Sequence, residues 1–333
     1  MNFHIEEIQT GNKAAWDAFV RESSQGSLFS TFLWKKILEA GIPFKQRIYA
    51  LYEKDQILGG VVLTEKKQLG HYTALNALLS PYLGFLLLPS ASTKISDKLS
   101  KEHEVLSSLI KFLEKRYAQI DLNNAPELND VRPFIQRHWQ TIPRYTYYLN
   151  LANLNALWEN FDGSVRRIIK KAQTSGLHVS HITGHPTEIF SLLEATWGKH
   201  SDINPIPESL VREIVTSGDL ESQRIVIGAH TPEGKLISVI VCLWDWNRAY
   251  YLIAASEPEH LSTGVNSLLI WELAGYLSKI PVTQLDFIGG NIPNIARFKE
   301  TFNPQLINYY RTERWNSLLF RMIKKAGQYI LRR

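Results

Sequence analysis

Two stretches of the chain carry the same pattern of hydrophobic and polar positions. Residues 46–51 and 57–63 are two mainly hydrophobic runs joined by a short polar segment. Residues 223–228 and 236–243 repeat this arrangement in the second half of the chain. Two hydrophobic runs that flank a polar turn are typical of a β-hairpin. The sequence therefore predicts one hairpin in each half.

Each predicted hairpin is followed by an amphipathic helix and then by a further strand. Hydrophobic side chains recur at helical spacing at Leu106, Leu109, Ile110, Leu113 and Tyr117 in the first half and at Leu269, Leu273 and Leu277 in the second. The strands expected next are residues 119–124 and 284–289. Each leads through a polar loop into a short helical segment, 131–139 or 292–302, and then into a tyrosine-rich strand.

The same elements in the same order indicate a duplicated unit. A repeat that matches in type and order across five elements is a signature of repeated architecture. We therefore predict an α+β (α/β mixed sheet) fold made of two similar domains, residues 1–148 and residues 149–333.

Composition narrows the class of protein. With 44% hydrophobic and 21% charged residues, the 333-residue chain has the balance of a globular protein, which excludes a coiled-coil or largely disordered chain. The net charge of +5 is too small to indicate nucleic-acid binding by itself, and no DNA partner is predicted. One cysteine, Cys242, excludes a disulfide framework and a multi-cysteine metal site. We predict no metal site and no tightly bound cofactor.

The ends of the chain bear on its location. Residues 1–10 include Glu6 and Glu7 and lack the basic and apolar runs of a secretory signal. The longest apolar stretch, residues 74–88, is interrupted by polar residues and is shorter than the roughly 20 residues of a membrane span. The prediction is a cytoplasmic protein without a transmembrane helix. Residues 320–333 alternate hydrophobic and basic side chains, which is typical of a helix docked on its domain or lying on an anionic membrane or on RNA.

Two segments of the second half carry a resemblance to a known family. They are residues 164–179, SVRRIIKKAQTSGLHV, and residues 285–302, in which Asp286-Phe287 precedes two glycines and the pair Phe298-Lys299. In these segments and in its doubled order of elements, the chain resembles tandem proteins of the Gcn5-related N-acetyltransferase (GNAT) fold. It is most similar to the Fem-type (FemAB/FemX-like) enzymes, which attach amino acids to peptidoglycan precursors, and to their acyltransferase relatives.

The resemblance implies a place for the acyl donor. In this fold the donor lies where two central strands diverge, and its phosphates rest on backbone N–H groups at the start of the next helix. Strand 249–255 and turn 260–266 correspond to that place, and Gly264, Val265 and Asn266 are expected to bind the donor. Leu261 and Asn266 depart from the acetyltransferase signature, so an ordinary loop with a helix cap is the alternative. The donor is left open between aminoacyl-tRNA and acyl-CoA.

The resemblance also implies an acyl-transfer centre at Lys299. In the Fem-type pattern this lysine, which follows Phe298, is associated with acyl transfer, and an ammonium there can stabilise a developing oxyanion. Phe298 is expected to contact substrate. Asp286 is the second catalytic candidate, because a carboxylate can orient the acceptor amine. The alternatives are a solvated helix lysine for Lys299 and a structural role for Asp286, whose counterpart in the first half is Asp121.

A basic cluster is the second candidate for donor binding. Arg166, Arg167, Lys170 and Lys171 place four cations within six residues. On a helix, residues 166 and 170 share one face and residues 167 and 171 the adjacent one, so the cluster can bind a phosphate-rich donor. A solvated run of charges is the alternative.

Two aromatic residues of the first half correspond to acceptor-binding elements of the family. These are Trp34 and Tyr82, the latter in the turn Ser80–Gly84, with a core tryptophan and a plain loop as the respective alternatives. Asp245 and Glu194 are further carboxylates able to deprotonate an ammonium group. The sequence does not select between them.

The function expected from the resemblance is N-acyl transfer. The second domain would hold the transfer centre, and the first would help to form the acceptor site. The acceptor is an amine, with a nucleotide- or lipid-linked muramyl peptide of the cell envelope among the candidates. The alternative is a non-catalytic binding or assembly protein on the same scaffold, since fold does not dictate function.

Overall fold

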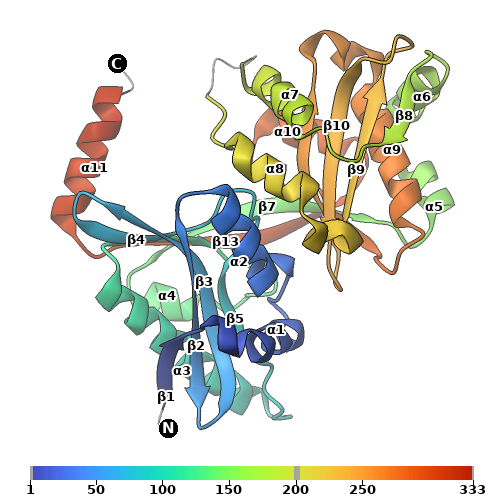
Figure 1. Ribbon diagram of the computed structural model, residues 1–333. Helices are drawn as coiled ribbons and strands as arrows, with labels where there is room; N and C mark the ends of the chain where they lie inside the picture. The colour runs from blue at the N-terminus through green and yellow to red at the C-terminus, as the bar shows by residue number, and fades with distance from the viewer. Residues whose placement is uncertain (1–2, 199–202, 332–333) are drawn as a thin grey trace. The chain divides into compact units, whose positions relative to one another are not determined.

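The computed structural model of the chain describes residues 3–198 and 203–331, with the side chains of the last helix described to residue 324. The chain folds into two compact units (Figure 1). Unit 1 comprises Met1–Glu39, Pro43–Arg144 and Asn308–Arg333, and unit 2 comprises Ala40–Ile42 and Tyr145–Ile307.

Unit 1 is a mixed sheet with helices. Its elements are β1 (Phe3–Glu7), α1 (Lys13–Glu22), α2 (Phe32–Gly41), β2 (Lys45–Glu53), β3 (Gln56–Gln68), β4 (His71–Leu75), β5 (Gly84–Leu87), α3 (Ile95–Arg116), β6 (Gln119–Asn123), α4 (Arg132–Gln136), the start of β7 (Gln140–Asn150), the end of β13 (Gln305–Trp315) and α11 (Leu318–Leu331). Strands β2 and β3 are antiparallel, and β4 pairs with β6 in parallel.

Unit 2 repeats this architecture. Its elements after β7 are α5 (Leu154–Asn160), α6 (Gly163–Gln173), β8 (His178–His181), α7 (Pro186–Gly198), α8 (Glu208–Thr216), the 3-10 turn η3 (Gly218–Gln223), β9 (Arg224–His230), β10 (Leu236–Trp244), β11 (Ala249–Ser256), the 3-10 turn η4 (Pro258–Thr263), α9 (Val265–Leu277), β12 (Gln284–Asp286) and α10 (Pro293–Glu300). Strands β9, β10 and β11 are antiparallel, and β11 pairs with β12 in parallel.

The repeated pattern predicted from the sequence is confirmed element by element. The two hairpins are β2–β3 and β9–β10, and the two predicted helices are α3 and α9. Helix α3 is amphipathic as predicted, whereas α9 is not, because consecutive residues Leu268, Leu269 and Ile270 are all buried. The short helical segments are α4 and α10, and the tyrosine-rich strands are β7 and β13. Hydrophobic spacing was enough to predict these elements because each packs on a core. Strand β10 and helix α9 are buried on more than one side, so hydrophobic and polar residues do not alternate there.

The compact units differ from a simple division of the chain at residue 148. Unit 1 ends at Arg144 and resumes at Asn308. The reason is strand pairing: the end of β13 pairs with β6 of unit 1, from Arg311↔Asn123 to Trp315↔Gln119. The end of β7 pairs instead with β12 of unit 2. Each unit is therefore completed by a strand that the repeat pattern assigns to the other half.

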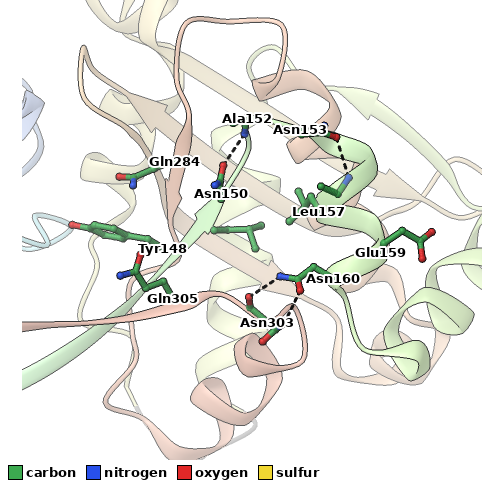
Figure 2. Close-up of a pocket in the computed structure, with 12 residues that line it drawn as sticks. Tyr148, Asn150, Ala152, Asn153, Leu157, Glu159, Asn160, Gln284, Asn303 and Gln305 are labelled. Atoms are coloured by element: carbon green, nitrogen blue, oxygen red, sulfur yellow. Dashed lines mark hydrogen bonds between the residues drawn. The ribbon is translucent and has the colours of Figure 1, made fainter.

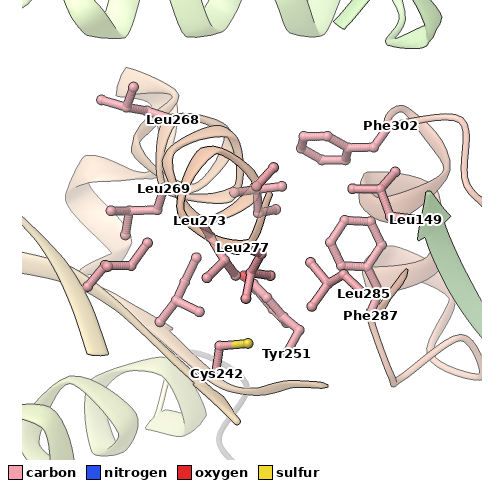
Figure 3. Close-up of a cluster of buried hydrophobic side chains, with 14 of the residues drawn as sticks. Leu149, Cys242, Tyr251, Leu268, Leu269, Leu273, Leu277, Leu285, Phe287 and Phe302 are labelled. Atoms are coloured by element: carbon pink, nitrogen blue, oxygen red, sulfur yellow. The ribbon is translucent and has the colours of Figure 1, made fainter. Parts of the chain in front are cut away.

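Each unit has its own hydrophobic core. In unit 1, helix α3 buries Leu106, Leu109, Ile110 and Leu113 against the sheet. In unit 2, Leu269, Leu273 and Leu277 of α9 pack on the sheet, with Tyr251, Leu285 and Phe287 in the same cluster (Figure 3). Burial of these apolar side chains is the main stabilising contribution in each unit.

The described residues contain neither a helix suited to span a membrane nor a cluster of metal-binding side chains. In residues 3–198 and 203–331, no helix has both the length and the apolar character that crossing a bilayer requires. In the same residues, no group of three or more histidine, cysteine, aspartate or glutamate side chains is placed to hold a metal ion.

Candidate acyl-transfer site

The central feature of unit 2 is a divergence of two parallel strands. Strand β11 pairs with β12 only at Ala249↔Leu285 and Tyr250↔Asp286, and then continues to Ser256. A bulge interrupts the pairing of β11 with β10 at this point, because Cys242 pairs with Tyr251 whereas Val241 pairs with Ile253. A bulge bends its strand and increases the local twist. The edge of β11 beyond Tyr250 is therefore turned away from β12.

A helix N-terminus follows the free end of β11. After η4, Gly264 adopts φ +82° and begins α9. A side chain is strained in this left-handed conformation, and a Cβ at Gly264 would lie 2.3 Å from Cγ2 of Ile168 on α6. The first turn of a helix leaves backbone N–H groups without intrahelical partners, and these attract anions. The predicted donor residues Gly264 and Val265 lie at this terminus, where the N–H of Gly264 donates to the carbonyl of Leu261 and that of Val265 donates to Oγ1 of Thr263.

The side chain of Asn266 is engaged in hydrogen bonds within unit 2. Its Oδ1 accepts hydrogen bonds from the hydroxyls of Ser256, at 2.5 Å, and Ser238, at 3.1 Å. The two hydroxyls are themselves 2.7 Å apart. This polar cluster ties the end of β11 and the start of β10 to the first turn of α9. The side chain of Asn266 thus holds the helix in position.

The basic cluster lies on α6, beside the start of α9. Val165, Ile169 and Ala172 bury one face of α6, and Ile168 contacts Gly264. The cations occupy the remaining faces, and three of the four have partners of their own. Arg166 pairs with Glu159 at 2.5 Å, Arg167 donates to the carbonyl of Gly163, and the ammonium of Lys170 lies 6.0 Å from the ring centre of Trp158. Within the basic cluster, Arg167, Lys170 and Lys171 are exposed to solvent. The structure therefore brings the basic helix next to the predicted donor turn.

Lys299 is buried, with only 5% of its surface exposed. Its Nζ donates to the main-chain carbonyls of Phe287, at 2.6 Å, and Ile288, at 2.7 Å, and lies 5.5 Å from the ring centre of Tyr251. Burial lowers the pKa of Lys299 to about 8, against the opposing effect of Asp286. A solvated helix lysine is therefore the wrong description of this residue. Its ammonium fixes the turn after β12, where Ile288 and Gly289 both have positive φ.

Asp286 is completely buried at the end of β12. Its Oδ1 accepts hydrogen bonds from the hydroxyl of Thr146, at 2.5 Å, and from the backbone N–H of Ile288, at 2.8 Å. These bonds stabilise the same turn that Lys299 holds from the other side. Lys299 and Asp286 thus lie together around residues 287–289, and both are engaged with the main chain or with Thr146.

The predicted substrate-binding residues occupy packed positions. Phe298 is half-buried and packs edge to face on Phe302, 5.3 Å between ring centres. In unit 1, Trp34 is completely buried, and its indole N–H donates to Ser80 at 2.7 Å. Tyr82 is also buried and packs on Tyr309. Trp34 and Tyr82 therefore form part of the core of unit 1, and the ligand contacts assigned to them stay predictions.

The two further carboxylates are held in different ways. Asp245 is buried and accepts hydrogen bonds from the hydroxyl of Tyr250 and from the backbone N–H groups of Asn247 and Arg248. Glu194 accepts a hydrogen bond from Asn204. The bonds of Asp245 stabilise the turn between β10 and β11. Sequence patterns did not reveal this turn, and they did not reveal Thr146, Ser238 or Ser256, because isolated polar residues carry no periodicity.

The corresponding gap in unit 1 is filled by the chain itself. Strand β4 pairs with β6 up to Leu75↔Asp121, and residues 76–83 then leave the sheet before β5 rejoins β3. This segment bonds along the edge of β6: the N–H of Asn76 donates to Asp121, and that of Leu83 donates to Asn123. Unit 1 therefore has no open counterpart of the β11 edge among its described residues.

Unit 2 also contains a cavity of about 660 Å³ at the other edge of β12 (Figure 2). Half of its twelve lining residues carry amide side chains, namely Asn150, Asn153, Asn160, Gln284, Asn303 and Gln305. Asn160 and Asn303 hydrogen-bond to each other, and Asn153 caps α5. The lining residues do not include Lys299, Asp286 or Gly264. The cavity is therefore separate from the site built around the diverging strands.

Comparisons with known proteins agree with this geometry. Residues 160–300 match the family model described as an acetyltransferase (GNAT) domain. No curated protein sequence matches the chain. Among solved structures, the chain is similar to FemX, with 14% identity, a TM-score of 0.64 and coverage of 92% of this chain and 96% of that one. It is also similar to L-PGS from Bacillus licheniformis, with 14% identity, a TM-score of 0.53 and 96% coverage of both chains.

A third similar structure is a tandem GNAT protein from the clavulanic acid biosynthesis pathway. It shares 11% identity with this chain and has a TM-score of 0.55, with coverage of 95% of this chain and 99% of that one. At such identities the likeness establishes the fold. The predicted α+β fold of two GNAT-like units, with its resemblance to Fem-type proteins, is thus confirmed.

Proposed function

We propose that this GNAT-type acyltransferase moves an acyl or aminoacyl group from a phosphate-bearing donor to an amine, and that the transfer takes place in unit 2. The observation that carries the proposal is the divergence of β11 from β12 after Tyr250↔Asp286, with the N-terminus of α9 at the end of the same strand. The matched domain model spans both features, since it covers residues 160–300.

The donor is held by its phosphates and its carbonyl. The first turn of α9 offers backbone N–H groups and the positive end of the helix dipole to a phosphate. Exposed cations on α6 lie beside it, because Ile168 of α6 contacts Gly264. The acyl carbonyl is placed at the edge of β11 between Tyr250 and Ser256, where backbone donors would stabilise the oxyanion that forms during transfer. The N–H of Ser256 itself donates to Thr196.

The reaction itself needs little covalent help from the protein. The amine nitrogen attacks the acyl carbonyl, the new C–N bond forms, and the C–O or C–S bond to the donor breaks. The amine gives up one proton, and the leaving oxygen or sulfur takes one. In this scheme Lys299 and Asp286 are positioning residues, because they hold the turn 287–289 at the mouth of the diverging strands. Correct placement of the two reactants supplies much of the rate.

The donor and the acceptor are tested directly by binding. The full chain is heated with coenzyme A, acetyl-CoA, uncharged tRNA or a nucleotide-linked muramyl peptide, each at low and at high salt. A ligand at 100 times its dissociation constant adds about 2.7 kcal/mol of stability. Stabilisation by tRNA that falls steeply with salt identifies an aminoacyl-tRNA donor. Stabilisation by coenzyme A with little salt dependence identifies an acyl-CoA donor, and stabilisation by the muramyl peptide identifies a cell-envelope acceptor.

Matched variants locate the site. Lys170→Gln and Lys171→Gln on α6 should weaken donor binding, whereas Lys111→Gln, at an exposed lysine of α3 in unit 1, should not. If no donor stabilises the chain, or if all three variants behave alike, the proposed donor site is wrong.

One observation favours a second candidate, a binding or assembly protein that performs no transfer. The Nζ of Lys299 already has two main-chain acceptors, which is the pattern of a structural lysine. Lys299→Met separates the two candidates once a donor is known. An acyltransferase should lose turnover with donor binding retained, and a binding protein should show no turnover before or after the substitution.

A further inference from the structure

Helix α11 of unit 1 has the reverse of the usual distribution of side chains. Phe320 is completely buried and contacts the rings of His71 and Trp315, and Lys324 donates to Gln119 at 2.6 Å. The side turned toward the unit thus includes a cation. The opposite side is apolar and exposed to solvent. The exposed fraction of the residue is 73% for Leu318, 65% for Leu319 and 67% for Met322, and Ile323 is also exposed. An exposed helix face is normally polar, so this face has the character of a contact surface.

A second exposed apolar group lies beside this helix. The turn between β3 and β4 exposes Leu69 and Tyr72. His71 of the same turn contacts Phe320, which places the turn against α11, and Figure 1 shows α11 next to β4. Lys67 lies over the ring of Tyr72, 5.6 Å from its centre. The turn and the helix therefore form one surface, called here the α11 surface, in which apolar and basic side chains alternate.

The charge at the α11 surface is unbalanced. A cavity of about 760 Å³ at the foot of α11 is lined by four cations and two carboxylates: Arg144, Arg311, Arg321, Lys324, Asp121 and Glu313. Arg311 engages both carboxylates, and within the described residues Nε of Arg144 is buried without a hydrogen-bond partner. Burial and the nearby charge of Lys324 lower the pKa of Lys66. Cations that crowd together in this way fit an anionic partner.

We propose that the α11 surface docks on a bilayer that contains anionic phospholipid. Apolar side chains of a helix that lies in the membrane interface enter the headgroup region, and flanking lysine and arginine residues contact lipid phosphates. The sequence of residues 318–333 contains five basic residues and no acidic one. A second copy of the chain is a poorer partner for this surface, because it would bring the exposed Lys67 beside Tyr72 against another basic surface.

The test is sedimentation of the full chain with vesicles. One set contains phosphatidylcholine alone and the other contains phosphatidylglycerol as well. The protein should bind the second set, and added salt should weaken the binding. Met322→Glu removes an apolar contact at an exposed position and should lower the affinity by about tenfold. Arg321→Gln removes one cation and should lower it by about fivefold.

A matched control is Ile135→Glu, which changes an exposed isoleucine of α4 in the same unit and should leave vesicle binding unchanged. Circular dichroism melts of all three variants establish that they are folded. The proposal is overturned if the protein binds neither vesicle type, if it binds both equally, or if Ile135→Glu weakens binding as much as Met322→Glu. It is also overturned if Met322→Glu abolishes a dimer in sedimentation velocity without affecting vesicle binding, since a second copy would then be the partner.

Discussion

Replacing Lys299 by methionine should remove a pH dependence from the stability of the protein. Burial lowers the pKa of Lys299 from its ordinary 10.5 to about 8, with Asp286 opposing the change. In the unfolded chain the same ammonium titrates at its ordinary value of about 10.4. Between pH 8 and pH 10 the unfolded state therefore binds this proton more tightly than the folded state does.

The sign and size of the effect follow from this difference. Stability rises with pH wherever the unfolded state binds more protons. The pKa difference of about 2.5 corresponds to a total of about 3 kcal/mol at about 1.4 kcal/mol per pKa unit. Roughly 2 kcal/mol of that falls between pH 8 and pH 10. The free energy of unfolding of the wild type should rise by this amount relative to Lys299→Met, in which nothing titrates at residue 299.

Urea unfolding followed by tryptophan fluorescence measures the effect at pH 8, 9 and 10. The comparison between the two proteins cancels contributions from other groups, such as Tyr250, whose pKa burial raises. Lys279→Met, at an exposed lysine, is the control and should follow the wild type at each pH. A constant difference between wild type and Lys299→Met from pH 8 to pH 10 would refute the reasoning, because the ammonium would then titrate alike in both states.

Three further predictions concern the diverging strands. Gly264→Ala should cost about 1–2 kcal/mol of stability, because an alanine is strained at φ +82° and its Cβ would clash with Ile168. The same variant should weaken donor binding. Gly275→Ala, whose Cβ meets nothing within 4 Å, is the control for both effects, and thermal melts compare the two variants. Thr146→Val should lower the free energy of unfolding by about 1–3 kcal/mol, since buried Asp286 loses a donor, whereas Thr146→Ser should keep most of it. Isothermal titration should find one donor site per chain, and a stoichiometry of two would contradict the assignment of transfer to unit 2 alone.

The sequence predicted the repeated elements well because their pattern is local. The spacing of Leu269, Leu273 and Leu277 reports a buried helix face directly, and all three are completely buried. The exchange of strands between the units could not be predicted in this way. Residues 308–315 have the same strand pattern whether they pair with β12 or with β6, and only the tertiary structure selects β6. Pairing between distant segments leaves no periodic signal.

The candidate site was predicted in part, and its details depend on polar contacts. The sequence placed Gly264 at a helix start, and the structure confirms this position. It named Lys299 and Asp286 as separate candidates, and the structure places both at the turn after β12. It gave no account of how those side chains are held. Asn266 bonds inward to two serines, and Trp34 bonds to Ser80, because buried polar groups take hydrogen-bond partners wherever the fold offers them. Such partners come from distant segments and cannot be read from spacing.

The two units also explain why one copy is suited to hold a donor. Leu75 in unit 1 and Tyr250 in unit 2 occupy equivalent positions, since each ends the parallel pairing with the next strand. Beyond that point, unit 1 inserts residues 76–83 before antiparallel pairing resumes at Gly84, whereas in unit 2 Tyr251 still pairs with Cys242 and only Leu252 is skipped before Ile253.

The same position thus carries an inserted segment in one unit and a bulge in the other. In unit 1 the N–H groups of Asn76 and Leu83 donate to carbonyls of β6, so the inserted segment covers that strand. In unit 2 no such segment follows the bulge, and at the end of β11 the N–H of Ser256 donates to Oγ1 of Thr196 on α7. Buried main-chain groups seldom remain unpaired, and unit 1 satisfies those next to β6 with its own inserted segment. This difference between the units supports the proposal that the donor binds in unit 2.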